Sequence, residues 1–138
     1  MSLYTMFKAN ESREKDDGIV LDYGTAKIRV RRAGGSNRKF SDLLTKKLRP
    51  YKRQLENETL DPDTGTRVMA EVYAEAIVTG WEGVTDSADK PLPFTRDNCV
   101  KLFLDLPDLF RDVQEQAQKL ANFREEEIEA DTKNSLMS

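Results

Sequence analysis

The first hydrophobic pattern in this chain has a period of two. Residues 19–21 form a short β-prone run, and at positions 26–30 apolar residues alternate with basic ones. Such alternation is typical of a strand with one buried face. The stretch DYG at 22–24 lies between the two runs at turn spacing, so the pattern predicts a β-hairpin over residues 18–33 with one cationic face.

From residue 40 onward the apolar residues recur at helical spacing instead. The first stripe consists of Phe40, Leu43, Leu44, Leu48, Tyr51 and Leu55. Ser36 or Asn37 can cap this helix at its start. A proline inside a helix removes a hydrogen bond, so Pro50 predicts either a kink or an end near Leu48 followed by a restart.

A second helix is expected from about Thr66 to Thr79, with Gly80 as its C-terminal cap. Its apolar face consists of Val68, Met69, Val72, Tyr73, Ala76 and Ile77. Residues 81–94 then read as a surface loop with two prolines. Trp81 and Phe94 are large enough to anchor both ends of that loop into the core.

Two further helices complete the pattern. Thr95 is a good N-cap for a short helix that contains Cys99, and Pro107 ends that helix and opens the next one. The last helix is expected from about Asp108 to Glu129. The predicted fold class is therefore α+β, mainly α, with an N-terminal hairpin packed on about four helices.

Length and composition favour one ordered domain. The chain has 138 residues, of which 38% are hydrophobic and 34% are charged, which is enough apolar material for a modest core. We expect a flexible lead-in over 1–17, a single helical domain over 18–130 and a disordered tail over 131–138. The N-terminus lacks the apolar core of a signal peptide, which predicts a cytoplasmic protein.

Candidate chemistry is sparse. Histidine is absent and there is one cysteine, Cys99, which lies within an apolar stripe and reads as a core residue. The stretch starting at Asp61 resembles the beginning of a calcium loop, but Thr66 and Val72 occupy the positions that need glycine and glutamate. We therefore expect no enzyme activity, no cofactor and no metal site.

The glycine pair Gly34 and Gly35 could form a phosphate-binding loop, because backbone amides that lead into a helix N-terminus attract anions. No second glycine stands at the spacing that a P-loop or a dinucleotide fingerprint requires. A plain joint between strand and helix is favoured over a weak anion site.

Charge is distributed very unevenly. Between Lys27 and Arg53 there are eleven lysines or arginines and one acid, Asp42, although the whole chain has a net charge of −3. This asymmetry suggests self-complementary assembly or a basic face for a partner. The cations next to the glycine pair are Arg29, Arg31, Arg32, Arg38 and Lys39. We rank their expected targets as an acidic patch of another copy, an acidic partner chain and nucleic acid, in that order.

Six stretches follow one another in order over nearly the whole chain: SLYTMFK, DYGTAKIRVRRAGGSNRKF, RPYKRQLE, VYAEAIVTGWEGVTD, LPFTRDNCVKLFLDLPDLFRDVQEQA and NFREEEIEAD. Together they resemble the tail assembly chaperones of long-tailed (siphovirus-like) bacteriophages and prophages. The resemblance implies a non-virion assembly factor that acts in the cytoplasm of the bacterial host. Such chaperones bind the tape-measure protein, keep it soluble and help tail-tube subunits gather around it. Many also exist in a longer, frameshifted form.

Three residues of the last helix, Leu109, Phe110 and Val113, could dock a helix of the tape-measure protein. The same stripe could serve as the core of this domain, and a chain of this size favours that second interpretation. Two alternative functions stay open on the sequence alone. They are a basic-faced nucleic-acid-binding protein and a minor structural component of a phage tail.

Overall fold

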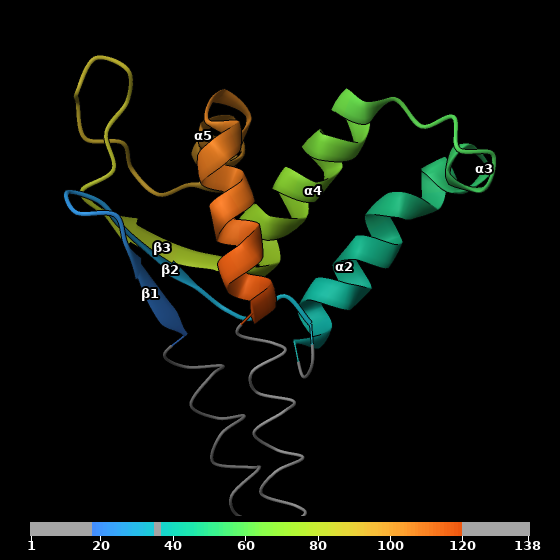
Figure 1. Cartoon of the computed structure of the whole chain (residues 1–138), viewed down its shortest axis with the longest axis horizontal. Coiled ribbons are helices and arrows are strands. Elements are labelled where there is room, and N and C mark those ends of the chain that lie inside the picture. The colour runs from blue at the N-terminus through green and yellow to red at the C-terminus, as the bar shows by residue number, and fades with distance from the viewer. Residues whose placement is uncertain (1–17, 35–36, 120–138) are drawn as a thin grey trace, which may run out of the picture.

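The computed structural model describes residues 18–34 and 37–119 (Figure 1). In chain order the elements are β1 (Ile19–Asp22), β2 (Lys27–Val30), α2 (Arg38–Leu48), the 3-10 turn η1 (Arg49–Tyr51), α3 (Lys52–Glu56), α4 (Pro62–Ala76), β3 (Val78–Glu82) and α5 (Arg96–Asp105). Residues 107–119 form a further helical stretch, called here the C-terminal helical segment. This arrangement confirms the mainly helical α+β class. The predicted lead-in 1–17, the tail 131–138 and the end of the last helix lie outside the described residues.

The predicted hairpin is confirmed, and a third strand extends it. The antiparallel sheet has the order β1-β2-β3, with Val20 opposite Arg29 and Ile28 opposite Trp81. Ile28 and Val30 point into the core and are buried, while Lys27 and Arg29 are exposed on the outer face. A charged outer face and an apolar inner face are what the alternating sequence requires.

The strand β3 corrects the expectation for residues 77–82. The helix predicted to end at Thr79 ends at Ala76, and Gly80 lies inside β3 opposite Arg29 instead of capping the helix. The residues at 77–79 are all β-branched, which favours a strand over a helix. Hydrogen bonding of residues 78–82 to the distant strand β2 then favours the strand over the helix.

Helix α4 also begins earlier than predicted, at Pro62 instead of Thr66. The Asp61 side chain accepts a hydrogen bond from the Thr64 backbone N–H at 3.2 Å, and proline is well suited to the first turn. The cluster of proline, aspartate and glycine at 61–65 is therefore the cap and first turn of the helix.

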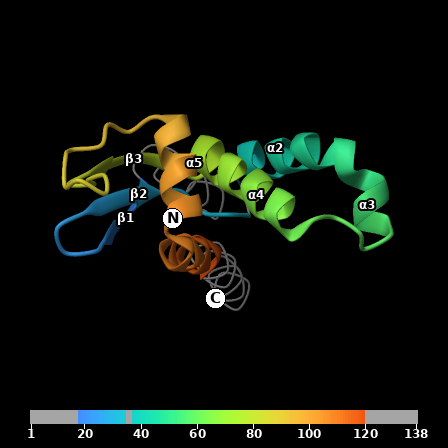
Figure 2. The ribbon, with the colours of Figure 1, turned by 90° about the horizontal axis from the view of Figure 1, so that it is seen from above.

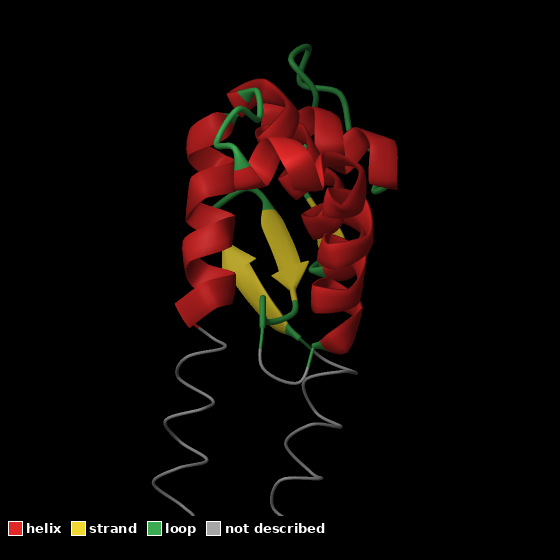
Figure 3. Cartoon of the chain, turned by 90° about the vertical axis from the view of Figure 1, so that its right-hand side faces the viewer, coloured by secondary structure: helices red, strands yellow, loops and turns green. Residues whose placement is uncertain are grey.

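The core lies between the inner face of the sheet and the helices. In Figure 3 the C-terminal helical segment and α2 stand on either side of the strands. Aromatic rings form a continuous chain through this core: Phe40 meets Tyr73 edge-on at 5.8 Å, Tyr73 meets Phe110 at 5.5 Å, and Phe110 stacks on Phe103 at 4.7 Å between ring centroids. These contacts join α2, α4, α5 and the C-terminal helical segment into one unit.

The loop after β3 is anchored by the two aromatic residues that the sequence predicted. The Trp81 indole donates a hydrogen bond to the Leu92 carbonyl oxygen at 2.8 Å, and its ring meets Phe94 edge-on at 5.0 Å. Both rings are half-buried and pack against the core. Asp86 and Asp89, at the tip of the loop between them, are exposed.

Residues 38–56 comprise α2, η1 and α3; α2 lies beside α4, and α3 lies at the end of the molecule away from the sheet (Figure 2). We call this part the basic arm. Asn37 caps it, since its Oδ1 accepts from the Phe40 N–H at 3.2 Å, and Pro50 interrupts it after Leu48 as predicted. None of its residues is fully buried, and Leu55 is 43% exposed. The apolar stripe of the arm is therefore only partly covered.

Ion pairs hold the basic arm to the rest of the fold. Lys47 Nζ lies 3.3 Å from a Glu71 carboxylate oxygen and 3.8 Å from one of Glu75. Arg96 of α5 contacts the same Glu75 at 2.6 Å. One cation of the basic arm, Lys47, is thus paired with acids of α4. This pairing lowers the repulsion between Lys47 and the neighbouring cations.

The tip of the hairpin is tied to the C-terminal helical segment by a side-chain hydrogen bond. The Tyr23 hydroxyl donates to an Asp112 carboxylate oxygen at 2.6 Å. Burial, together with the bond to this carboxylate and its negative charge, raises the pKa of Tyr23 well above its usual range.

Replacing Tyr23 by phenylalanine should lower the free energy of unfolding at pH 7 by about 1 kcal/mol, because a partly exposed bond to a carboxylate is lost. The raised pKa means that the unfolded chain ionises first, so stability is complete below about pH 10 and falls as the pH rises further. Urea unfolding from pH 8 to 11 should show a shallower alkaline loss for Y23F. An unchanged alkaline slope would contradict this assignment.

Candidate functional site

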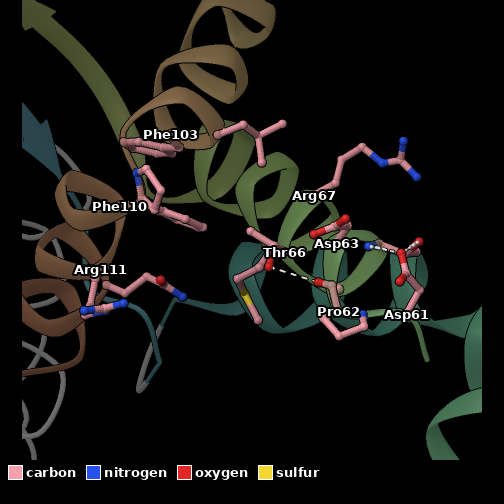
Figure 4. Close-up of a pocket in the computed structure, with 14 residues that line it drawn as sticks. Asp61, Pro62, Asp63, Thr66, Arg67, Phe103, Phe110 and Arg111 are labelled. Atoms are coloured by element: carbon pink, nitrogen blue, oxygen red, sulfur yellow. Dashed lines mark hydrogen bonds between the residues drawn. The ribbon is translucent and has the colours of Figure 1, made fainter. Parts of the chain in front are cut away.

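A groove of about 1030 Å³ lies on the helical side of the molecule. It lies between the first half of α4, the end of α5 and the start of the C-terminal helical segment (Figure 4). Met69, Phe103 and Phe110 supply its apolar floor. Phe103 and Phe110 are core residues whose edges reach the groove, so its position is fixed by the packing of the domain.

A sharp corner between two helices forms one side of the groove. Helix α5 ends as the Leu106 N–H donates to the Leu102 carbonyl oxygen at 2.9 Å, and the next helical turn opens at Pro107. Leu104 and Pro107 stand at this corner, and Leu104 is 40% exposed. The corner therefore places uncovered apolar side chains beside a hollow, a combination typical of a docking surface.

Glycine at position 65 shapes the opposite side of the groove. Gly65 lies within α4, and a methyl group at this position would meet only the Leu60 side chain at 3.6 Å, an ordinary contact. The fold thus does not require glycine here, although glycine costs about 1 kcal/mol relative to alanine inside a helix. Its absent side chain leaves room for another backbone to approach α4 closely.

Charged side chains flank the groove. Figure 4 shows Arg67 on one side and Arg111 on the other, while Asp61 and Asp63 lie at the start of α4. Arg111 also contacts Asp108 at 3.8 Å, and both of these side chains are largely exposed. An apolar floor with cations on two sides suits an amphipathic segment that carries acids beside its apolar face.

The core assignment of Cys99 is confirmed. Its side chain is fully buried, and burial raises the pKa of the thiol to about 12. At neutral pH the sulfur is therefore a neutral, enclosed thiol that acts as a small apolar residue.

Within the part of the chain that the structure describes, no three carboxylate or thiol groups lie close enough to hold a metal ion. Over the same residues, no helix is both long and apolar enough to cross a membrane.

The cations that the sequence singled out are not brought together on one surface. Arg29 is exposed on the outer face of the sheet, whereas Arg38 and Lys39 are exposed at the start of α2. Arg31 is half-buried and Arg32 is 4% exposed. The period of two explains Arg32, because this residue continues the inward-facing series of the strand.

The apolar stripe of the last helix is mainly core. Phe110 and Val113 are buried, and Leu109 is half-buried and packs against the same cluster. Of these three residues, Phe110 also lines the groove. The interpretation of the stripe as core, which the sequence favoured, is thereby confirmed for Phe110 and Val113.

Of the residues that line the groove, the sequence had singled out only Phe110 as a contact. The residues that shape the groove most, Gly65, Met69, Leu104 and Pro107, were not predicted to do so. One signal was available, since Leu104 falls outside the apolar stripe of its helix and an outward-facing leucine is then expected. The groove as a whole has no local signature, because three separate elements form it.

A family model described as YdaY prophage protein matches residues 35–134, which is more than half of the chain. The chain belongs to the YdaY prophage protein family. No curated protein and no solved structure matches it. The part shared with the YdaY family includes the basic arm, the groove and the acidic stretch that follows the C-terminal helical segment. Strands β1 and β2 precede the matched residues. The phage origin expected from the sequence is thus established at the level of a prophage protein.

Proposed function

We propose that this YdaY-family chain is a tail assembly chaperone that binds the tape-measure protein through the groove. The observation that supports it best is an apolar groove beside the exposed Leu104, in a protein of prophage origin. A tape-measure protein is a long helical chain, and helix-in-groove contact is a general mode of recognition for such segments. Binding would cover apolar surface on both molecules and so keep the partner soluble.

The lining of the groove supports one kind of partner helix. Its floor takes large apolar side chains, Gly65 admits a close backbone, and Arg67 and Arg111 favour acids on either side of the apolar face. Charge complementarity of this kind mainly orients the partner helix and speeds its association, and it contributes less to the binding affinity. The partner segment would therefore be an amphipathic helix with acidic flanks.

Co-expression with the tape-measure protein of the same prophage tests this function. The wild-type chain should keep that protein soluble and co-purify with it, and Leu104→Lys should reduce the recovered complex at least about tenfold by placing a charge in the apolar contact. Leu106→Lys is the matched control, because Leu106 is 48% exposed on the same corner but does not line the groove.

The outcomes separate the function from the site. If the wild-type chain recovers no tape-measure protein, the chaperone function is wrong. If L104K recovers as much as wild type, the chaperone function stands and the groove is not its binding site.

We further propose that the protein acts in the host cytoplasm, promotes assembly of the tail tube and is left out of the finished particle. Mass spectrometry of purified particles distinguishes this role from that of a minor tail component. Stoichiometric recovery of the chain in particles would favour the structural role instead.

A further inference from the structure

The basic arm presents a cationic surface that the fold uses only in part. It has seven basic and two acidic residues. Lys47 contacts Glu71 and Glu75 of α4. The other six basic side chains are all exposed: Arg38, Lys39, Lys46, Arg49, Lys52 and Arg53. Like charges at this density repel each other unless an anionic surface lies close by.

The chain itself contains a segment with the complementary charge. Residues 125–131, EEEIEAD, hold five acids and no base, and we call them the acidic segment. They also contain one large apolar residue, Ile128, and the basic arm has Leu55 partly exposed among its cations. The two stretches therefore match in charge and each offers an apolar contact.

The geometry of the described residues directs this contact to another molecule. The Ala33 N–H donates to the Ala117 carbonyl oxygen at 3.1 Å, so the C-terminal helical segment ends beside the start of α2. In Figure 1 this segment descends while the basic arm rises to α3, at the opposite end. The described end of the C-terminal helical segment is therefore far from the outer half of the arm, where Arg49, Lys52 and Arg53 are exposed. A second copy can bring its own acidic segment to these three cations directly.

We propose that the acidic segment of one copy binds the basic arm of a second copy. The contact joins two different surfaces, so each bound copy still offers one free arm and one free acidic segment. Association then continues head to tail, rises with protein concentration and weakens with salt. This inference does not depend on the tape-measure protein, and both surfaces lie within the matched family range.

Sedimentation velocity of the full chain at about 50 mM and about 500 mM salt tests the proposal. Wild type should associate at low salt and dissociate at high salt. An arm variant, K46E/R49E/K52E, and a segment variant, E125K/E126K/E127K, should each associate at least about tenfold more weakly. Mixing the two variants should restore association, because the reversed arm then meets a reversed segment.

A matched control reverses three exposed acids elsewhere, in the variant D97K/D105K/E115K. It makes the same change in net charge as the segment variant and should leave self-association within about twofold of wild type. A wild-type chain that stays monomeric at low salt would overturn the proposal. The same holds if the control weakens association as much as the segment variant does, or if the mixture fails to recover it.

Nucleic acid is the alternative partner of the basic arm, and the same variants identify it. If wild type remains monomeric at low salt but retards duplex DNA, and K46E/R49E/K52E does not, the arm binds phosphates and the proposed self-association is wrong. A steep loss of DNA binding with salt would accompany that result.

Discussion

Replacing Phe103 by alanine should lower the free energy of unfolding by about 3–5 kcal/mol. The side chain is 1% exposed and stacks on Phe110, which in turn meets Tyr73. Removing the ring leaves a cavity at the point where α4, α5 and the C-terminal helical segment meet, and the neighbouring rings cannot close it without breaking their own contacts. Because the total stability of a domain of this size is about 5–15 kcal/mol, the loss is a large part of it.

The next residue provides the control. Leu104 is 40% exposed, so Leu104→Ala should cost less than about 1 kcal/mol. Denaturant unfolding followed by Trp81 fluorescence measures both variants. Equal losses for the two positions would show that the assignment of one residue to the core and of its neighbour to the groove edge is wrong.

Alanine at Gly83 is the second substitution with a large expected effect, of about 3 kcal/mol or more. Gly83 has a φ of +72°, a conformation that costs a residue with a side chain about 1–2 kcal/mol. A methyl group there would also overlap the Thr25 carbonyl oxygen, which is backbone and cannot rotate away. The turn of the hairpin and the end of β3 would have to separate.

Substitutions at two other glycines separate the conformational cost of Gly83→Ala from the cost of the steric overlap. Gly24 has a φ of +87°, and a methyl group there would have nothing within 4 Å, so Gly24→Ala should show the conformational cost alone, about 1–2 kcal/mol. Gly80 has neither feature, and Gly80→Ala should be neutral or stabilising by up to about 1 kcal/mol. Thermal unfolding of the three variants checks the order. A loss for G83A no larger than that for G24A would contradict the predicted overlap.

Features set by neighbouring residues could be predicted from the sequence. Asn37 and Thr95 cap the helices that follow them, and Pro50 and Pro107 interrupt or open helices as expected. In each case the physics is local, since a side chain bonds to an amide three residues away or a ring blocks one hydrogen bond.

The strand β3 could not be predicted, because its formation depends on a partner about fifty residues earlier in the chain. Gly80 interrupts its alternation of apolar and polar residues, and a bulge between Arg29 and Val30 shifts the pairing. Both features hide the period of two on which a prediction from sequence depends. Without knowledge of that partner strand, Gly80 is interpreted as the C-terminal cap of the preceding helix.

The groove escaped prediction for a related reason. Residues such as Met69 and Leu104 are ordinary members of their helices, and only the crossing of α4 with α5 places them on one hollow. Charge, by contrast, is additive along the sequence. The basic arm was therefore visible as a cluster of cations, although the burial of Arg32 and the ion pairs of Lys47 were not.

Because Cys99 is fully buried, the reactivity of its thiol reports how often the packing around helix α5 opens. The chain has one cysteine, so any thiol-directed label has one place to go. That place is sealed by the packing of α5 against the core, and a reagent reaches the sulfur only when this packing opens. The rate of labelling under native conditions thus measures how often the helix that forms the groove corner detaches, and a ligand seated in the groove would slow it.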